Sequence, residues 1–245
     1  MANLIVDEGN TLCKVAVMEE SEVLCEVATP NFDMEQVADM VAHFGVEQAI
    51  VASTRGGAEQ ICEQLRERVA KVLHFSSQTE VPIGVEYSSR QTLGADRIAV
   101  AVGVVCGMAI ENALVVDMGS AITFDVVENG CFKGGNISLG VEMRFKALHD
   151  YTARLPLCEA TEPVEAFGNS TKEAIEQGVM QGILYEIEGY VERVLQKNEK
   201  NSIIFCGGGA EFFVNRIKNA IFAPRKLMFT GLNLILEYNV SKNNI

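Results

Sequence analysis

The sequence predicts an α/β protein made of two similar halves around a central cleft. An apolar run ending in Asp-x-Gly-polar occurs twice, as LIVDEGNT at residues 4–11 and as LVVDMGSA at residues 114–121. Each copy opens the same expected order of three strands, a helix, a strand and a helix. Strands and helices that alternate along the chain in this way are typical of α/β architecture. We therefore expect an N-terminal half over 1–112 and a C-terminal half over 113–245.

In the first half, short apolar runs predict strands and longer amphipathic runs predict helices. The first helix has Asp33 at its start and Gly45 just beyond its end, which are common helix boundaries. The second helix is expected to carry Glu67 and Lys71 as an exposed pair one turn apart. The expected elements are strands at 3–7, 13–18 and 23–28, a helix at 33–44, a strand at 48–53, a helix at 58–72, an irregular segment at 76–92 and an Ala/Gly-rich helix through 98–110.

The second half repeats this order. Its longest helix is expected to begin at a capping box, in which Ser170 is followed three residues later by Glu173. A buried strand then ends in three glycines, at 207–209, before another helix. The expected strands are 113–118, 123–128, 130–138 and 202–206. A Gly/Ser/Pro-rich linker between the halves is absent, so we expect them to pack directly.

Composition excludes several classes of protein. The net charge of −13 over 245 residues argues against a nucleic-acid or anionic-membrane partner, because there is no basic surplus to meet phosphate charge. The seven cysteines form no CxxC pair, and scattered thiols on apolar stretches, such as Cys62 and Cys106, are expected to be buried and reduced. The longest apolar stretch, 98–110, is too short to span a bilayer, and the N-terminus reads as a strand rather than a signal peptide. We expect a cytoplasmic protein.

The two Asp-x-Gly repeats predict a nucleotide site. Each lies between two β-prone runs, which is typical of a β-hairpin with a tight glycine turn. Glycine allows backbone N–H groups to approach a ligand closely, and Asn10, Thr11 or Ser120 can donate to phosphate oxygens. An Asp at the end of a strand can hold a cation, which suits Asp7 and Asp117. Asp-x-Gly is also common in ordinary turns, but two copies in equivalent places favour two phosphate hairpins that face each other in an ATP site.

Several other polar residues and glycines have either a functional or a purely structural interpretation. Asp96 and Arg97 open a helix, where an anion binds well, but Asp96 is also a good N-cap and Arg97 an ordinary exposed charge. Asp125 is either part of the site or a solvated strand residue, and the glycines at 134–135 and 207–209 either admit a nucleotide or turn the chain. The sequence lacks P-loop, dinucleotide and nucleophile-elbow motifs, and its histidines have no metal-binding spacing.

Six motifs in order carry a family resemblance over nearly the whole chain. They are DEGNTLCK at 7–14, LGADR at 93–97 with Tyr87 before it, DMGSAIT at 117–123, GGNISLG at 134–140, TARLP at 152–156, and Thr171 before an Ala-Ile helix. In these motifs the chain resembles the type III pantothenate kinases, in the acetate and sugar kinase/Hsp70/actin superfamily. It departs from the family pattern at Ser120 (usually Thr), Leu139 (often Pro), Glu8 (usually uncharged) and Arg90 (near a common Pro). Glu8 would weaken nucleotide binding if its side chain faced the phosphates.

The resemblance implies two ribonuclease H-like (actin-like) halves with mixed sheets around a central cleft. It also implies transfer of the γ-phosphoryl group of ATP to pantothenate, which gives 4′-phosphopantothenate in the first step of coenzyme A biosynthesis. Asp96 would be the general base, and Asp117 would hold a monovalent cation, K⁺ or NH₄⁺, while Mg²⁺ accompanies ATP. ATP would contact Asp7, Glu8, Gly9, Asn10, Thr11, Leu12, Cys13, Lys14 and Ser120. Pantothenate would contact Tyr87, Gly94, Ala95, Asp96, Arg97 and Thr171, and the family implies a homodimer.

Two other functions stay open. A different small-molecule kinase of the same superfamily would share the hairpins, but it is not expected to combine GADR with Tyr87 and Thr171. A catalytically silent nucleotide-binding regulator would tolerate loss of Asp96, whereas this chain keeps the full set.

Overall fold

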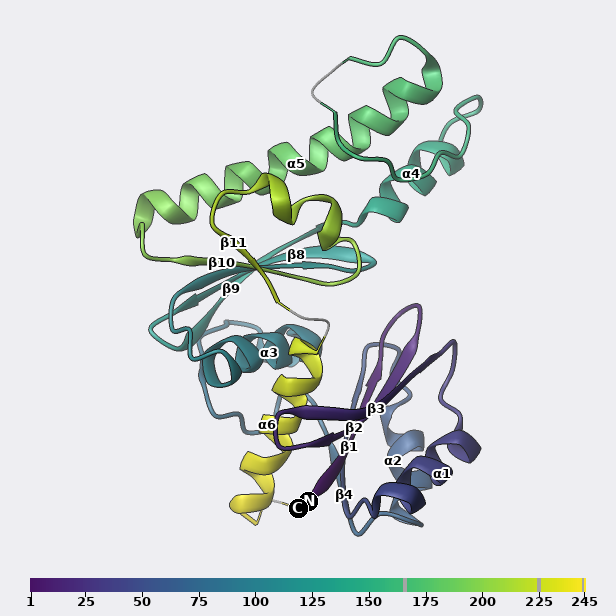
Figure 1. Cartoon of the computed structure of the whole chain (residues 1–245), viewed down its shortest axis with the longest axis vertical. Helices are drawn as coiled ribbons and strands as arrows, with labels where there is room; N and C mark the ends of the chain where they lie inside the picture. Colours follow the sequence, from purple (N-terminus) through teal and green to yellow (C-terminus); the bar gives the residue numbers. More distant parts are fainter. Residues whose placement is uncertain (165–166, 224–225, 244) are drawn as a thin grey trace. The chain divides into compact units, whose positions relative to one another are not determined.

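The computed structural model describes residues 1–164, 167–223, 226–243 and 245. The chain forms two compact units (Figure 1). The first contains Met1–Glu111, Gly130–Phe132 and Lys226–Ile245, and the second contains Asn112–Asn129 and Lys133–Arg225. The C-terminal segment from Lys226 therefore belongs to the same unit as the N-terminal segment.

The sheet of the first unit is mixed. Its central strand, β1, is antiparallel to β2 and parallel to β4, and the strand order is β3-β2-β1-β4-β5. Side chains alternate between the two faces of β1, so Leu4 and Val6 share one face while Ile5 points to the other. All three are fully buried, so the strand is covered on both sides. The strands are β1 (Ala2–Glu8), β2 (Cys13–Glu19), β3 (Glu22–Thr29), β4 (Gln48–Ser53) and β5 (Lys71–His74).

Helices cover both faces of this sheet. On one face, α1 (Met34–Phe44) and α2 (Ala58–Arg66) contribute to the core that includes Leu4 and Val6. Asp33 caps α1 by accepting hydrogen bonds from the backbone N–H groups of Glu35 and Gln36, and Gly45 ends the helix in the left-handed conformation, as its sequence predicts. The other face contacts α3 (Ala95–Val102) and the C-terminal helix α6 (Leu227–Ser241).

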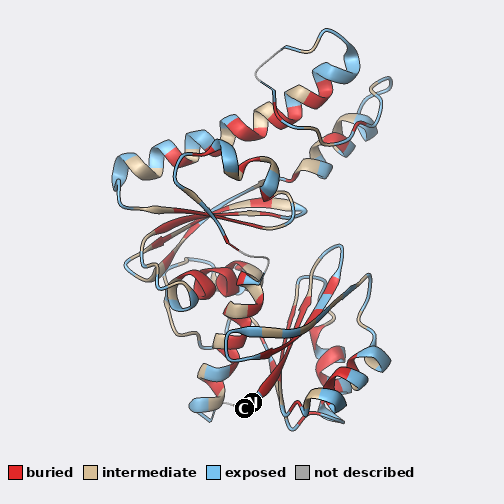
Figure 2. Cartoon of the chain, viewed as in Figure 1, coloured by how far each residue is buried: buried red, intermediate tan, exposed pale blue. Residues whose placement is uncertain are grey.

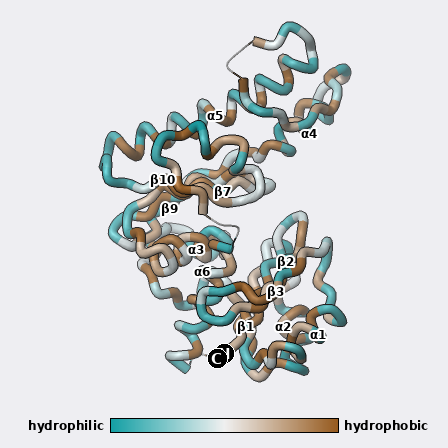
Figure 3. Tube along the Cα trace, viewed as in Figure 1, coloured by the Kyte–Doolittle hydropathy of each residue, from teal (hydrophilic) through white to brown (hydrophobic). Residues whose placement is uncertain are grey.

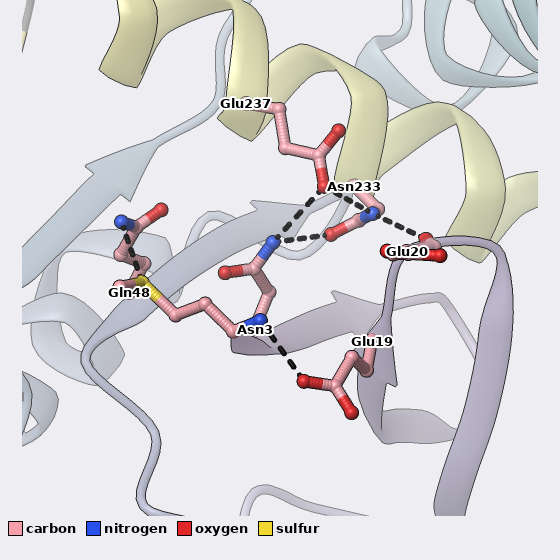
Figure 4. Close-up of polar contacts among 7 residues, drawn as sticks. Asn3, Glu19, Glu20, Gln48, Asn233 and Glu237 are labelled. Carbon is pink, nitrogen blue, oxygen red and sulfur yellow. Dashed lines mark hydrogen bonds and ion pairs between the residues drawn. The ribbon is translucent and has the colours of Figure 1, made fainter.

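Glycines and buried amides fix α6 in the first unit. A Cβ atom at Gly231 would lie 1.8 Å from the Ala99 carbonyl oxygen, so the backbones of α3 and α6 meet directly. Figure 4 shows the polar contacts between α6 and the sheet. The Asn3 amide donates to Asn233 Oδ1 (2.8 Å), and the Asn233 amide donates to the Glu20 carbonyl (2.9 Å). Asn3 and Asn233 are both buried, so their mutual hydrogen bond satisfies polar groups that water does not reach.

The second unit repeats the sheet of the first. Its order β9-β8-β7-β10-β11 matches β3-β2-β1-β4-β5, and the central strand β7 is antiparallel to β8 and parallel to β10. Figure 3 shows apolar residues gathered in the central strands. The strands are β7 (Ala113–Met118), β8 (Ala121–Glu128), β9 (Cys131–Leu139), β10 (Ser202–Cys206) and β11 (Ala220–Phe222). This confirms the prediction of two similar α/β halves with mixed sheets.

One long helix covers a face of the second sheet. Helix α5 (Thr171–Lys197) packs Ile183 and Ile187 into the core with Phe124 of β8 and Phe205 of β10. Figure 2 shows buried and exposed residues alternating along α5, as in an amphipathic helix. The predicted cap is present, since Ser170 Oγ accepts from the Glu173 N–H (3.3 Å). The remaining elements are α4 (Val141–Asp150) and the short 3₁₀ helices η3 (Ala210–Phe212) and η4 (Val214–Arg216).

Four sequence predictions about local structure were wrong. Cys106, which was expected to be a buried thiol, is exposed. Helix α2 ends at Arg66, and the rest of the predicted helix to residue 72 gives way to β5, which pairs with β4 and buries Leu73. Lys71 therefore lies on a strand and forms no helical pair with Glu67. The Ala/Gly-rich helix is α-helical only to Val102 and continues as a π-helix, η2 (Gly103–Gly107). Two 3₁₀ helices and β11 precede α6 where a helix was expected directly after the glycines.

The first unit also contains one short strand and one short 3₁₀ helix. Strand β6 (Gly84–Val85) pairs with residues 131–132 of β9, and the 3₁₀ helix η1 (Arg90–Thr92) lies shortly before α3. They belong to the segment predicted to be irregular. Among the helices of the described residues, none combines the length and the apolar character needed to cross a bilayer.

Candidate active site

The first hairpin closes with a tight turn at the end of the central strand. The Gly9 N–H donates to the Leu12 carbonyl (3.0 Å), and Asn10 and Thr11 are exposed at the tip. Asp7 is the last residue but one of β1 and lies opposite Lys14 in β2. The hairpin thus presents polar side chains and a glycine backbone beside an acid–base pair, which are the groups that contact phosphates in many nucleotide sites.

The second hairpin has the same construction in the second unit. The Gly119 N–H donates to the Ala121 carbonyl (3.0 Å), and Gly119 and Ser120 are exposed. Asp117 is the last residue but one of β7 and lies opposite Thr123 in β8. The sequence repeat is therefore a structural repeat.

Asp7 lies in a buried environment beside a second acid. Its side chain is 8% exposed, and burial raises its pKa from 3.8 to about 6. The positive charge of Lys14 lowers the pKa of Asp7, and the negative charge of Asp96 raises it further. The first unit therefore brings Asp7, Lys14 and Asp96 together, although they come from two strands and a helix.

Asp96 occupies the first turn of α3. The cap position is Gly94, so Asp96 is not the N-cap, and its Oδ1 accepts from the Arg97 N–H (2.9 Å). A Cβ atom at Gly94 would lie 2.3 Å from this oxygen, so the carboxylate occupies space that only glycine leaves open. The positive end of the helix dipole stabilises the negative charge at this position.

Arg97 is buried beside two aromatic rings. Only 6% of it is exposed, so it is not the ordinary surface charge that the local sequence allows. Its guanidinium carbon lies 5.9 Å from the Tyr87 ring centre and 5.6 Å from the Phe132 ring centre, within cation–π range. Tyr87 was predicted to be near Arg97, but Phe132 was not, because it comes from a different strand and has no motif of its own.

Asp117 lies against the glycine turn that follows β10. Cys206 pairs with Asp117, and the next residue, Gly207, has φ of +85°. A Cβ atom at Gly207 would lie 2.5 Å from both Asp117 Oδ1 and the Met118 carbonyl oxygen. The turn therefore belongs to the surroundings of Asp117, where a carboxylate and a carbonyl oxygen are close together. Such oxygens are ligands for hard cations. Among the described residues, no group of three or more His, Cys, Asp and Glu side chains could hold a metal.

Asp125 belongs to a buried polar arrangement in the second unit. It is 4% exposed and accepts from Thr123 Oγ1 (3.1 Å), so it is not a solvated strand residue. A Cβ atom at Gly135 would lie 2.5 Å from Asp125 Oδ1, which explains one glycine of the 134–140 motif. The last glycine of that motif, Gly140, donates its N–H to the Ser120 carbonyl (3.1 Å) and supports the second hairpin.

The predicted residues divide between the two units. The hairpin residues 7–14, Tyr87 and residues 94–97 lie in the first unit, whereas Asp117, Ser120 and Thr171 lie in the second. Thr171 is exposed at the first position of α5. Leu139, which replaces a common Pro, is exposed at the end of β9. The carboxylate of Glu8 accepts a hydrogen bond from Ser53 Oγ.

A family model described as type III pantothenate kinase matches residues 3–193, which is most of the chain. The chain belongs to the type III pantothenate kinase family. A type III pantothenate kinase from Phocaeicola vulgatus is 36% identical over 239 residues, which cover 97% of this chain and 98% of the relative. One from Porphyromonas gingivalis W83 is 37% identical over 242 residues, which cover 97% of this chain and 99% of the relative. The family predicted from the six motifs is confirmed.

Solved structures support the fold class. A ROK hexokinase from Thermus thermophilus aligns with a TM-score of 0.52 at 12% identity, covering 98% of this chain and all of that one. At this identity the likeness concerns the fold alone. It agrees with the paired mixed sheets, so the actin-like fold class that the type III pantothenate kinase resemblance implies is confirmed.

Proposed function

We propose that this chain transfers the γ-phosphoryl group of ATP to pantothenate and forms 4′-phosphopantothenate, the first step of coenzyme A biosynthesis. The observation that carries the proposal is similarity to type III pantothenate kinases over nearly the entire chain, with 36% identity to the Phocaeicola vulgatus relative across 97% of it. The arrangement of Asp7, Lys14 and Asp96 in the first unit supports a phosphoryl-transfer site, because such transfer depends on positioning and charge neutralisation.

Each of the two hairpins would contact the phosphates of ATP. In the first, residues 10–12 would offer backbone N–H groups, and Lys14 would meet a phosphate oxygen. In the second, Ser120 keeps the hydroxyl of the usual Thr and is exposed. Mg²⁺ bound with ATP would supply the charge neutralisation that a chain of net charge −13 lacks.

Asp96 would act as the general base. It is partly exposed at the N-terminus of α3, and its carboxylate is oriented by the Arg97 N–H. From this position it would accept the proton of the attacking hydroxyl as the phosphoryl group arrives. Arg97, Tyr87 and Thr171 would contact pantothenate, and the guanidinium plane of Arg97 suits the carboxylate of that substrate.

A monovalent cation, K⁺ or NH₄⁺, would be held at Asp117. The Asp117 carboxylate and the Met118 carbonyl oxygen both lie beside Gly207, and oxygens of this kind are ligands for such a cation. The cation would balance phosphate charge next to the second hairpin. The activity is proposed to be cytoplasmic, without a nucleic-acid or membrane partner.

Exposed apolar residues in the second unit support a homodimer. Ile137, Leu139, Met143 and Tyr185 are all exposed. They belong to one region, because Arg144 donates to the Leu139 carbonyl and to Ser138 and forms an ion pair with Glu186. Exposed large apolar side chains on neighbouring elements fit a surface that another chain covers.

The proposed function is tested by incubating the purified chain with Mg-ATP, K⁺ and a panel of small alcohols that includes pantothenate and several sugars. Of the alcohols in the panel, we expect only pantothenate to cause ADP release, and we expect its product to be heavier than pantothenate by one phosphoryl group. Release with a sugar but not with pantothenate would indicate a different kinase of the superfamily. ATP binding without turnover on any alcohol would indicate a silent regulator.

A further inference from the structure

Glu8 lies in the first phosphate motif, yet its side chain is turned away from Asp7. Successive side chains of β1 alternate, so Glu8 lies on the face of Leu4 and Val6, where α2 packs, while Asp7 lies on the face of α3. On its own face the Glu8 carboxylate accepts a hydrogen bond from Ser53 Oγ at the end of β4. The acidic residue that is unusual in this motif therefore has a defined partner within the first unit.

Ser53 connects Glu8 to the start of α2. Its Oγ accepts from the N–H groups of Arg55 (3.1 Å), Gly56 (3.0 Å) and Gly57 (3.2 Å), which form the turn before the helix. A Cβ atom at Gly57 would lie 2.7 Å from Glu8 Oε2, so this turn approaches the carboxylate closely. One hydroxyl thus joins the first hairpin to three backbone groups of another loop.

The backbone carbonyl of Glu8 also accepts hydrogen bonds. The Thr54 N–H donates to the Glu8 carbonyl (2.9 Å), and Thr54 Oγ1 donates to the same oxygen (3.2 Å). The next residue is Gly9, whose N–H closes the hairpin turn. Glu8 is therefore fixed through both its side chain and its backbone immediately before the glycine loop.

We propose that Glu8 and Ser53 are positioning residues for the phosphate loop at residues 9–12, and that the Glu8 side chain does not contact ATP. This inference rests on the proposed function. Hydrogen bonds to a carboxylate are stronger than those between neutral groups, so this tether restrains the loop effectively. A loop that is ordered before ATP arrives loses less conformational entropy on binding, which increases affinity. The hydroxyl bond also draws the carboxylate towards α2 and away from the hairpin tip.

The test uses Ser53→Ala, Glu8→Gln, Glu8→Ala and the double variant Ser53→Ala/Glu8→Ala. Glu22→Gln, on an exposed glutamate of β3, is the matched control. Ser53→Ala removes the tether without changing the charge, and Glu8→Gln keeps the size and an acceptor if Glu8→Ala fails to fold. We measure KM for ATP, KM for pantothenate, kcat and the thermal midpoint of each variant.

We expect Glu8→Ala to raise KM for ATP about tenfold, the effect of one lost hydrogen bond to a charged group. Ser53→Ala also removes the acceptor of the Arg55, Gly56 and Gly57 N–H groups, so it should raise KM for ATP at least as much. KM for pantothenate should stay within about twofold of the wild-type value. KM for ATP in the double variant should be no higher than in the more affected single variant, because both changes break the same tether. A purely structural role would lower the thermal midpoint without moving KM for ATP, and would overturn the inference. A lower KM for ATP in Glu8→Ala would also overturn it, because that result means the carboxylate faces the phosphates and repels them.

Hydrogen exchange without nucleotide separates this inference from the proposed function. Amides of residues 9–12 should exchange faster in Ser53→Ala and Glu8→Ala than in the wild type or Glu22→Gln. Unchanged exchange in both variants would refute the tether whether or not the chain is a kinase. Wild-type protein that turns over no alcohol would refute the proposed function, and the exchange rates would still decide whether the tether orders the loop.

Discussion

Replacing Asp7 with Asn should stabilise the protein while abolishing its activity. Asp7 is 8% exposed, and burial is the main cause that raises its pKa from 3.8 to about 6. At about 1.36 kcal/mol per pH unit, this rise corresponds to about 3 kcal/mol of free energy lost when the carboxylate is ionised in the folded state. The uncharged amide of Asn avoids that loss.

The sign of the pH dependence follows from the direction of the shift. Between about pH 4 and pH 6 the folded protein binds the Asp7 proton more tightly than the unfolded chain, so rising pH lowers the contribution of Asp7 to stability. Below that window the wild type and Asp7→Asn should be similar. Above pH 6 the variant should be more stable by up to about 3 kcal/mol, and the difference should then stay constant.

The assay is urea unfolding from pH 4 to pH 8 without nucleotide or Mg²⁺, with turnover measured on the same samples. We expect the stability difference to grow through the window and the Asn variant to be inactive, a combination typical of a residue kept for function at a cost in stability. A variant that is less stable than the wild type at pH 8, or a difference that does not change with pH, would refute the reasoning about burial.

Three further changes test other parts of the structure. In Gly94→Ala the new methyl group would lie 2.3 Å from Asp96 Oδ1, so kcat should fall about tenfold or more while the fold persists. An unchanged kcat would mean that the position of the Asp96 carboxylate does not affect turnover. If Asp117 holds K⁺, exchanging K⁺ for Na⁺ should lower wild-type activity and have little effect on Asp117→Ala; an equal response in both proteins counts against that site. Gly231→Ala would place a methyl group 1.8 Å from the Ala99 carbonyl oxygen, so the free energy of unfolding, measured by urea titration, should fall by about 1–3 kcal/mol. An unaltered free energy of unfolding would contradict the close α3–α6 packing.

The sequence predicts the repeated architecture well because the repeat has a physical signature. An apolar strand, an acid and a glycine turn occur twice, and both copies become the central strand and hairpin of a mixed sheet. The starts of α1 and α5 were also predictable, since Asp33 and Ser170 act through local hydrogen bonds that depend on neighbouring residues.

Features that depend on distant residues could not be predicted. The pattern of residues 58–72 fits a helical face, but pairing with β4 makes residues 71–74 a strand. Phe132 beside Arg97 and Ser53 beside Glu8 come from segments that only the folded chain brings near their partners. Nothing in the local sequence of α6 indicates that it packs in the first unit, because that choice depends on the buried Asn3–Asn233 bond and on close glycine contacts.

The central claim is that this chain moves a phosphoryl group from ATP to pantothenate with Asp96 as the base. The most direct test follows ³²P from the γ-position of ATP in single-turnover experiments on the wild type and Asp96→Asn. We expect label to appear in 4′-phosphopantothenate with the wild type, and the rate to fall roughly 10²–10⁴-fold in Asp96→Asn while ATP still binds. Label that stays in ATP, or passes only to water, with the wild type would contradict the claim, and an unchanged rate in Asp96→Asn would contradict the role of the base.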